Sequence, residues 1–446
     1  MNLTPNSKEI LRIALPAIIS NVTVPLLGMV DVAIAGHMGA SYIGAIAVGG
    51  LVFSIICWIF GFLRASTSGL TAQALGENCK EKIKAYYWRS VFFALAISAF
   101  LLAIQMPLGK IIFHFIGADS DTTGLVMTYY SICIWGIPAV MLTQALNGWF
   151  IGMQNTRIPM TIAIVQNIIN IPVSLVLVYG LAMKIEGIAI GTVTAQYVGL
   201  FIALILRRKN YGTYCGYPTK TSVMEWAEVG HFMYINRDIF LRTLCMVAVT
   251  TFFTTASARQ GELILAANTL LLQLFYFFSY VMDGFANAGE AIAGCHYGAK
   301  EYAALSSAVR TLFRWGVAIT LCFTLVYCVG GIPFLSLLTD SKEVLGIAPL
   351  YYWWVILIPS AGFAAFLWDG IFIGMTMTFG MLLSASIATI SFFICWYTTD
   401  ISLGNHALWL AFIIYLSMRG LFQTIIYARS IKTLLCSNTG NKKEAK

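Results

Sequence analysis

Charged side chains are scarce in this chain. Asp, Glu, Lys and Arg make up 10% of its 446 residues, against about 25% in an ordinary soluble domain. Hydrophobic residues make up 59% of the sequence. So few charges cannot cover the surface of a soluble protein of this length. The composition therefore excludes a soluble globular protein and predicts a polytopic membrane protein.

The sequence also lacks the motifs of several enzyme classes. It contains no Walker motif for binding a nucleoside triphosphate. Its ten cysteines form no CxxC pair or Cys/His cluster. The five histidines are spread without metal-ligand spacing or a nucleophile partner. We therefore expect no enzyme activity, no metal site and no cofactor apart from a coupling ion, H⁺ or Na⁺.

Apolar runs that can cross a bilayer are abundant. A spanning helix needs about 20 such residues, and hydropathy selects twelve segments: 10–36, 43–75, 88–106, 124–148, 158–182, 187–207, 231–258, 264–296, 311–332, 346–373, 378–398 and 406–428. The connecting loops are short. The predicted fold is an all-α polytopic membrane protein with twelve transmembrane helices.

Lysines and arginines are distributed unevenly between alternate loops. With the N-terminus inside, nineteen fall on the inner side and four on the outer side, and the other four of the 27 lie in or at the ends of spans. This distribution obeys the positive-inside rule and predicts a plasma (inner) membrane protein with both termini in the cytoplasm. The net charge of +8 thus reports topology and contact with membrane lipid, not a nucleic-acid partner.

The chain repeats itself at a constant offset. NGWFIGM at 147–153 matches DGIFIGM at 369–375, 222 residues later, and Gly39 and Gly76 match Gly261 and Gly298 at the same offset. We predict two six-helix bundles, residues 1–215 and 216–446, joined by a basic linker at about 207–222. Because each has an even number of spans, both have the same orientation and are related by a pseudo-two-fold axis along the membrane normal.

One carboxylate lies within the first apolar run, NVTVPLLGMVDVAIAGH at 21–37. An Asp at the bilayer centre costs about 2.5–3.5 kcal/mol on insertion scales and usually serves function. Pro25 lacks an N–H and predicts a helix hinge close to Asp31. We interpret the stretch as a proton or cation site beside a hinge, with an Asp at the water interface as the alternative.

Amides and hydroxyls line one side of the fifth span. Gln166, Asn170 and Ser174 are four residues apart and share a helix face. This stripe is expected to face the bundle interior. The sixth span adds Thr192. The alternative interpretation is hydrogen bonding that merely joins helices.

The second half carries three candidate acids. Asp283 and Glu290 are seven residues apart in the eighth span and share a helix face, which suggests an aqueous lining. Asp369 lies in an apolar run of the tenth span.

Three charged residues begin the seventh span and are candidates for a cytoplasmic gate. They are Arg237, Asp238 and Arg242. Asp238 and Arg242 are four residues apart, so they can pair on one helix face. An interfacial salt bridge is the alternative.

Several runs together resemble the multidrug and toxic compound extrusion (MATE) family, most closely its DNA-damage-inducible (DinF-type) branch. They are GMVDVAIAGHMG, GLTAQALGEN, INRDIFLRT, DGFANAGEAIAGCHYGA and WDGIFIGM. The resemblance covers nearly the whole chain. It implies antiport by alternating access, in which drugs or toxic organic compounds leave the cell in exchange for H⁺ or Na⁺.

The resemblance also assigns roles to residues. Asp31 matches the first-helix coupling acid, Asn170 and Thr192 match its amide and hydroxyl neighbours, and Asp369 lies near a second-half acid of other branches. Ser174 stands where this branch commonly has a second acid, which weakens Na⁺ capture and favours H⁺. We expect small cationic or amphipathic organic substrates and a monomer.

Other functions remain open. A flippase for polyprenyl-linked saccharides of the same superfamily would use a ring of cations, for which Arg64, Arg237, Arg242 and Arg419 are the candidates. A membrane-embedded enzyme and a non-transporting sensor or scaffold are the remaining alternatives. A scaffold predicts no solute counterflow in vesicles.

Overall fold

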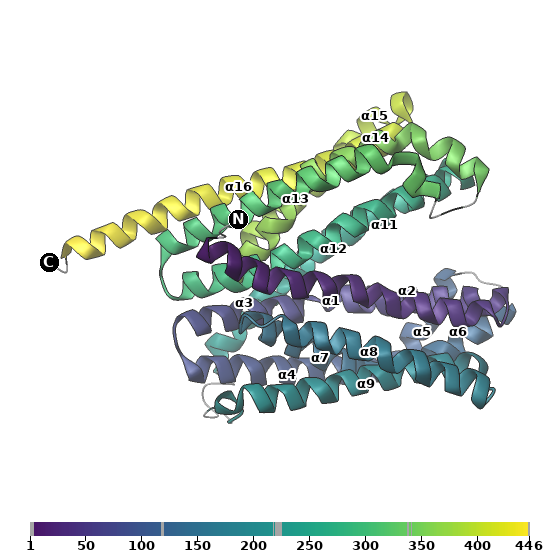
Figure 1. Cartoon of the computed structure of the whole chain (residues 1–446), viewed down its shortest axis with the longest axis horizontal. Coiled ribbons are helices and arrows are strands. Elements are labelled where there is room, and N and C mark those ends of the chain that lie inside the picture. The colour runs from purple at the N-terminus through teal and green to yellow at the C-terminus, as the bar shows by residue number, and fades with distance from the viewer. Residues whose placement is uncertain are drawn as a thin grey trace. The chain divides into compact units, whose positions relative to one another are not determined.

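The computed structural model describes residues 4–116, 120–216, 218, 225–336, 339 and 341–444, and this described part is helical with no strand. Twelve helical stretches are long and apolar enough to cross a membrane (Figure 1). They are Pro5–Gly36, Ser41–Gly76, Lys80–Ala103, Thr123–Gly152, Arg157–Gly180, Lys184–Asn210, Trp226–Arg259, Glu262–Gly298, Tyr302–Gly331, Lys342–Gly374, Thr378–Leu403 and Asn405–Thr433. The twelve predicted spans are thereby confirmed.

The observed helices begin earlier than hydropathy predicts at two places. The third span begins at Lys80 and the ninth at Tyr302, whereas the apolar runs begin at 88 and 311. The early residues of both helices include charged side chains, such as Lys82 and Lys84 in the third span and Arg310 in the ninth. These residues lower the hydropathy but do not stop the helix.

Two spans of the first half are built from two helices each. α2 (Ala40–Ile59) and α3 (Phe62–Gly76) meet at Gly61, and α6 (Ser120–Cys133) and α7 (Ile137–Gly152) are joined by a 3-10 turn, Ile134–Gly136. Pro138 lies in the first turn of α7, where its missing N–H leaves no hydrogen bond unmade. The other first-half helices are α1 (Pro5–Gly36), α4 (Lys80–Ala103), α5 (Gln105–Ile116), α8 (Arg157–Leu175) and α9 (Lys184–Asn210).

The second half consists of longer helices. They are α11 (Trp226–Arg259), α12 (Glu262–Gly298), α13 (Tyr302–Ser336), α14 (Lys342–Gly374), α15 (Thr378–Leu403) and α16 (Asn405–Glu444). Three helix starts recur at an offset of 222: α2 and α12 begin at 40 and 262, α4 and α13 at 80 and 302, and α6 and α14 at 120 and 342. We call two residues separated by 222 paired positions.

Paired positions share backbone conformation as well. Left-handed residues occur in pairs at the helix ends: Gly39 and Gly261, Asn78 and Lys300, Gln154 and Thr376, and Ala182 and Gly404. The repeat read from short sequence matches therefore extends to the turns between the helices.

Glycines allow two helices to cross closely in each half. A Cβ at Gly148 of α7 would overlap the carbonyl oxygen of Arg64 in α3, and one at Gly370 of α14 would overlap that of Ala286 in α12. Both members of each contact are paired positions. These crossings explain why the NGWFIGM and DGIFIGM runs recur, since only glycine lets the backbones approach so closely.

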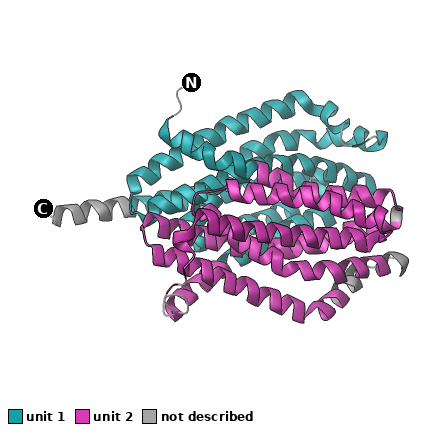
Figure 2. Cartoon of the chain, turned by 60° about the horizontal axis from the view of Figure 1, so that its bottom comes forward, with its two compact units in different colours: residues 1–18, 237–446 teal, residues 19–236 magenta. Residues whose placement is uncertain are grey.

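The chain forms two compact units (Figure 2). Unit 2 is Ile19–Asn236, and unit 1 is Met1–Ile18 with Arg237–Lys446. The first residues of α1 belong to unit 1, where Ile10 is 1% exposed and lines a small apolar cavity with Leu312 and Ile371. The first residues of α11 belong to unit 2, where Phe232 stacks on Phe93 with ring centres 5.0 Å apart. The predicted boundary at 215/216 describes the sequence repeat. The compact units differ from it, because the start of α1 belongs to unit 1 and the start of α11 belongs to unit 2.

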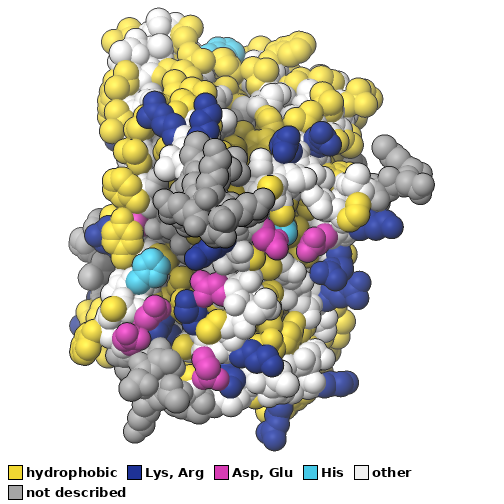
Figure 3. Space-filling view, turned by 90° about the vertical axis from the view of Figure 1, so that its left-hand side faces the viewer, with side chains coloured by type: hydrophobic (Ala, Val, Ile, Leu, Met, Phe, Trp, Pro, Cys, Tyr) yellow, Lys and Arg dark blue, Asp and Glu magenta, His cyan; other side chains and the backbone are white. Residues whose placement is uncertain are grey.

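Lysines, arginines and acids lie on the face of the molecule that Figure 3 shows. In unit 2 the start of α4 holds Lys80, Lys82 and Lys84, and the end of α9 holds Arg207 and Arg208. Large apolar side chains such as Val24, Leu51 and Phe201 are exposed between the helix ends, as expected of surfaces that face lipid.

Candidate functional site

Asp31 lies inside unit 2, in the part of α1 that belongs to that unit. Asp31 is only 3% exposed. The Oγ1 hydroxyl of Thr192, in α9, donates a hydrogen bond to Asp31 Oδ2 at 2.8 Å. The carboxylate is thus enclosed by its own bundle, which argues against the alternative of an Asp exposed at the water interface.

The stripe predicted on the fifth span reaches the same place. Asn170 Nδ2 donates to Thr192 Oγ1 at 3.1 Å and to Ser174 Oγ at 3.5 Å. Asn170 and Ser174 are both fully buried. α9 approaches α8 closely here, since a Cβ at Gly191 would overlap the Ser174 hydroxyl. Asp31, Thr192, Asn170 and Ser174 thus form one continuous polar group, which we call the Asp31 site.

The backbone beside the Asp31 site is irregular. Pro172 lies inside α8, and a π-helical turn, Val176–Gly180, follows directly after Leu175. Such turns are frequent at functional sites. On the turn before Asn170, Asn167 Nδ2 donates to the carbonyl oxygen of Thr23 at 3.2 Å, which joins α8 to α1. α1 itself is one helix from Pro5 to Gly36, so Pro25 does not end it, and its role as a hinge stays a prediction.

Two residues of α6 complete the Asp31 site, and sequence reasoning missed both. Tyr129 and Cys133 lie within electrostatic range of the Asp31 carboxylate. Tyr129 and Cys133 belong to an apolar cluster with Ile34, Ile46 and Ile188. The only signal in the sequence was their spacing of four residues, which is also that of ordinary core residues.

No cation balances Asp31 among the residues that the structure describes. Its Oδ1 atom is buried without a hydrogen-bond donor, and so is the Oδ1 atom of Asn170. The donors present, a hydroxyl and an amide, are neutral. The searched part of the chain also has no group of three His, Cys, Asp or Glu side chains that would hold a metal ion. The Asp31 site therefore offers unused acceptor oxygens to a proton or a small cation.

The described residues of unit 1 hold no copy of the Asp31 site. The positions paired with Asp31, Asn170, Ser174 and Thr192 are Phe253, Phe392, Trp396 and Ile414. Phe253 is 1% exposed and packs edge-on against Trp409 and Phe412, with ring centres 5.0 and 5.4 Å away. Aromatic packing thus fills the region of unit 1 that corresponds to the polar group of unit 2.

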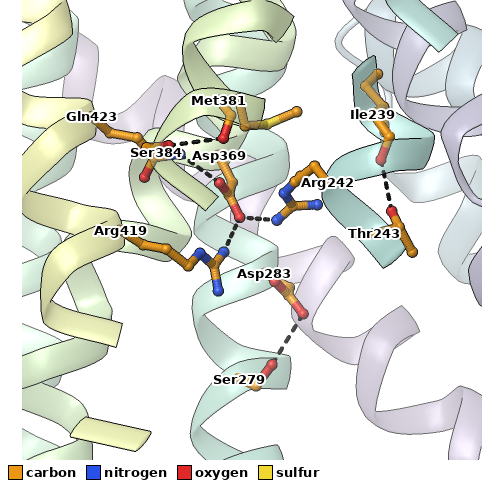
Figure 4. A network of polar contacts seen from close by, with 10 residues as sticks. All are labelled: Ile239, Arg242, Thr243, Ser279, Asp283, Asp369, Met381, Ser384, Arg419 and Gln423. Atoms are coloured by element: carbon orange, nitrogen blue, oxygen red, sulfur yellow. Dashed lines mark hydrogen bonds and ion pairs between the residues drawn. The ribbon is translucent and has the colours of Figure 1, made fainter. Parts of the chain in front are cut away.

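Asp369 has different surroundings from Asp31. Arg242 of α11 forms an ion pair with its Oδ2 atom, and Arg419 of α16 donates to the same atom at 2.5 Å (Figure 4). Gln423 Nε2 donates to Asp369 Oδ1 at 2.7 Å. This second-half acid is thus held by two cations and an amide. We call these four residues the Asp369 cluster.

The other two second-half acids lie on α12. Asp283 is half-buried and accepts a hydrogen bond from Ser279 Oγ at 3.3 Å (Figure 4). Glu290 is 1% exposed. The interpretation of both acids as an aqueous lining is therefore wrong for Glu290, which is packed inside unit 1 where Gly374 crosses its backbone.

The predicted gate residues separate into two groups. Arg237 donates to Asp238 Oδ1 from Nη2 at 2.8 Å and from Nε at 3.1 Å. Thr378 Oγ1 donates to Asp238 Oδ2 at 3.1 Å. Arg242 pairs with Asp369 instead of Asp238, although Asp238 is one turn away. The predicted pair of Asp238 and Arg242 is therefore wrong. Arg237 and Thr378 already donate to both carboxylate oxygens of Asp238.

Comparison with known proteins places these features in a family. The MatE family model matches residues 16–176 and again residues 239–398. The two matches begin 223 and end 222 residues apart, in agreement with the paired positions. The chain belongs to the MatE family. This family comprises multidrug and toxic-compound efflux transporters.

Curated MatE relatives extend over most of the chain. DNA damage-inducible protein F of Escherichia coli is 35% identical over 433 residues, which are 96% of this chain and 93% of that protein. Protein DETOXIFICATION 44, chloroplastic, of Arabidopsis thaliana is 24% identical over 82% of this chain and 72% of its own length. A probable multidrug resistance protein NorM of Photorhabdus laumondii is 23% identical over 76% of each chain.

Solved MATE structures share the fold. A crystal structure of a MATE protein in the bent conformation superposes with a TM-score of 0.87 at 16% identity, and covers 98% of both chains. The Vibrio cholerae MATE transporter VcmN in its bent form gives 0.85 at 17% identity, over 96% of this chain and 97% of that one. The predicted fold, an all-α MATE-like membrane protein with twelve spans, is thus confirmed.

Proposed function

We propose that this MatE protein is a secondary antiporter of the inner membrane, with both termini in the cytoplasm, and exports small organic compounds in exchange for H⁺. The observation that carries the proposal is the state of Asp31, a buried carboxylate whose hydrogen-bond donor is a neutral hydroxyl. An ionised carboxylate held in this way is costly. Taking up a proton from outside removes that cost, so protonation stabilises the packed state of the site.

The residues of the Asp31 site favour H⁺ over Na⁺. A sodium ion needs several oxygen ligands and gains from negative charge. The site supplies oxygens from Asp31, Asn170, Ser174 and Thr192, but only Asp31 carries charge. A proton needs a single oxygen, and the unpartnered Oδ1 of Asp31 is one.

The continuity of α1 supports the proposal of alternating access. The helix carries Asp31 in unit 2, and its first residues, including Ile10, pack within unit 1. A change in how Asp31 packs against α8 and α9 therefore acts on a helix that both units share. One charge moving through 100 mV supplies about 2.3 kcal/mol, or roughly a fifty-fold gradient. That energy supports export without ATP.

Transport by the full chain in proteoliposomes tests the proposal. An imposed pH gradient should drive accumulation of a fluorescent organic substrate by the wild type, and Asp31→Asn should lower the rate by about tenfold or more. Glu262→Gln is the matched control, because it makes the same carboxylate-to-amide change in the exposed first turn of α12. Wild-type rates for Asp31→Asn would end the assignment, and transport driven by a sodium gradient alone would replace H⁺ with Na⁺.

The saccharide-lipid flippase has weaker support. Only two of its four candidate cations, Arg242 and Arg419, meet within unit 1, and they do so on a shared carboxylate. Arg237 is bound to Asp238, and Arg64 belongs to unit 2. A pyrophosphate would require a ring of cations, and the described residues of unit 1 provide a pair.

A further inference from the structure

The Asp369 cluster contains more cations than anions among the groups in direct contact. Arg242 and Arg419 both bind Asp369 Oδ2, so one carboxylate faces two guanidinium groups. Gln423 occupies the other oxygen of Asp369. The carboxylate therefore has few free lone pairs for a further cation. The net charge of Arg242, Arg419 and Asp369 together is +1.

Hydrogen-bond donors in this cluster remain unused. The Nε atoms of both Arg242 and Arg419 are buried with no acceptor among the described residues. The Arg419 side chain is 2% exposed, and its guanidinium lies 5.4 Å from the centre of the Tyr415 ring. The side chains of Arg242 and Asp369 are 14% and 10% exposed, so the cluster reaches the surface of unit 1. Buried donors without acceptors are costly, and an anionic group would satisfy them.

The fold of the repeat does not require these charges. In unit 2, the positions paired with Arg242, Asp369, Arg419 and Gln423 are Ser20, Asn147, Tyr197 and Phe201. None of these four is charged, yet Gly148 next to Asn147 makes the same close helix crossing as Gly370 next to Asp369. Unit 2 therefore builds the same helix crossing without an ion-pair cluster. Because the fold does not need the cluster, we assign the cluster in unit 1 to ligand binding.

Two further acids lie near the cluster in the chain or in space. Asp238, one turn before Arg242, is bound by Arg237 and Thr378. Asp283 of α12 lies below the cluster in Figure 4 and accepts from Ser279. Removing the negative charge of Asp283 is therefore a second way to change the affinity for an anion, because it acts through the long-range potential and not through a contact.

The geometry points to an anion-binding subsite at Arg242 and Arg419 for the exported compound. Its ligand is an organic molecule with one carboxylate, sulfonate or phosphate group attached to an apolar body. The planar guanidinium groups match such oxygens. Asp369 keeps the two arginines in place and limits how tightly the anion is held, so that it can leave. This inference rests on the proposed export function and replaces the expected cationic substrate with an anionic one.

Equilibrium binding to the full chain in nanodiscs tests the subsite without any ion gradient. The probes are naphthalenesulfonate and naphthylmethylammonium, which share a ring system and differ in charge, and calorimetry gives both dissociation constants. The wild type should bind the sulfonate more tightly. Arg242→Gln should weaken sulfonate binding by about tenfold. Arg237→Gln is the matched control, because it removes the same charge from the same helix at a side chain that is 57% exposed.

Two acid variants give a result that a purely structural cluster would not. Asp369→Asn and Asp283→Asn should each strengthen sulfonate binding by a few-fold, because each removes a competing negative charge. Equal effects of Arg242→Gln and Arg237→Gln, or weaker sulfonate binding by both acid variants, would overturn the inference. Because binding is measured at equilibrium, a failure of H⁺-driven export would leave this result intact, and the two proposals can fail separately.

Discussion

Thr192 donates a hydrogen bond of 2.8 Å to Asp31, 161 residues earlier in the chain, and thereby joins α9 to α1 inside unit 2. Asn170 donates in turn to the Thr192 hydroxyl. The hydroxyl thus connects the candidate coupling acid to α8 and α9. Any change in the charge of Asp31 alters this hydrogen bond first.

Replacing Thr192 by valine keeps the shape of the side chain and removes the donor. Thr192→Val should slow pH-driven export by about tenfold, since a hydrogen bond to a charged group contributes about 1.5–3 kcal/mol. Thr192→Ser keeps the hydroxyl and should retain most of the activity. Initial rates in proteoliposomes measure both variants, and equal rates for valine and serine would show that the hydroxyl has no role in coupling.

Phe253 stands at the position paired with Asp31, and the structure gives it a packing role. Phe253→Leu should lower the stability of the protein by about 1–3 kcal/mol through lost packing. The number of protons exchanged per substrate should not change. Thermal unfolding in detergent and proton flux in vesicles measure the two effects. A changed proton count would mean that unit 1 also takes part in coupling.

The glycines at the close helix crossings should tolerate a larger side chain equally poorly in the two halves. Gly148→Ala and Gly370→Ala would each place a methyl group against a backbone carbonyl, of Arg64 and Ala286 respectively. We expect both to reduce the yield of folded protein strongly. Gly346→Ala is the control within α14, because no atom lies within 4 Å of its added Cβ. Normal yields of Gly148→Ala, measured by size-exclusion chromatography, would contradict the close crossing.

The fold class and part of the Asp31 site can be predicted from the sequence. The twelve apolar runs and the positive-inside pattern each depend on many residues. A wrong assignment of a few residues therefore does not change the predicted number of spans. Asp31 is visible as the one acid in the first apolar run, and the spacing of Asn170 and Ser174 places both on one helix face. Thr192 is visible only as a polar residue of the sixth span, and its role beside Asp31 comes from the family resemblance, because a threonine in a span carries no signal of its partner.

Contacts between distant helices account for what the sequence did not reveal. Tyr129 and Cys133 look like ordinary core residues of α6 until α1 places Asp31 beside them. Arg242 and Asp369 are 127 residues apart, and spacing along one helix suggested Asp238 as the partner. Periodicity reports which face a residue is on, whereas the packing of helices decides which other residue that face meets.

Proton movement driven by the substrate tests the central claim most directly. Proteoliposomes with a pH-sensitive dye in the lumen are given a substrate gradient and no ion gradient. The wild type should move protons against the direction of substrate flow, and Asp31→Asn should move none while it still exchanges labelled for unlabelled substrate. Proton flux through Asp31→Asn at the wild-type rate would contradict the account.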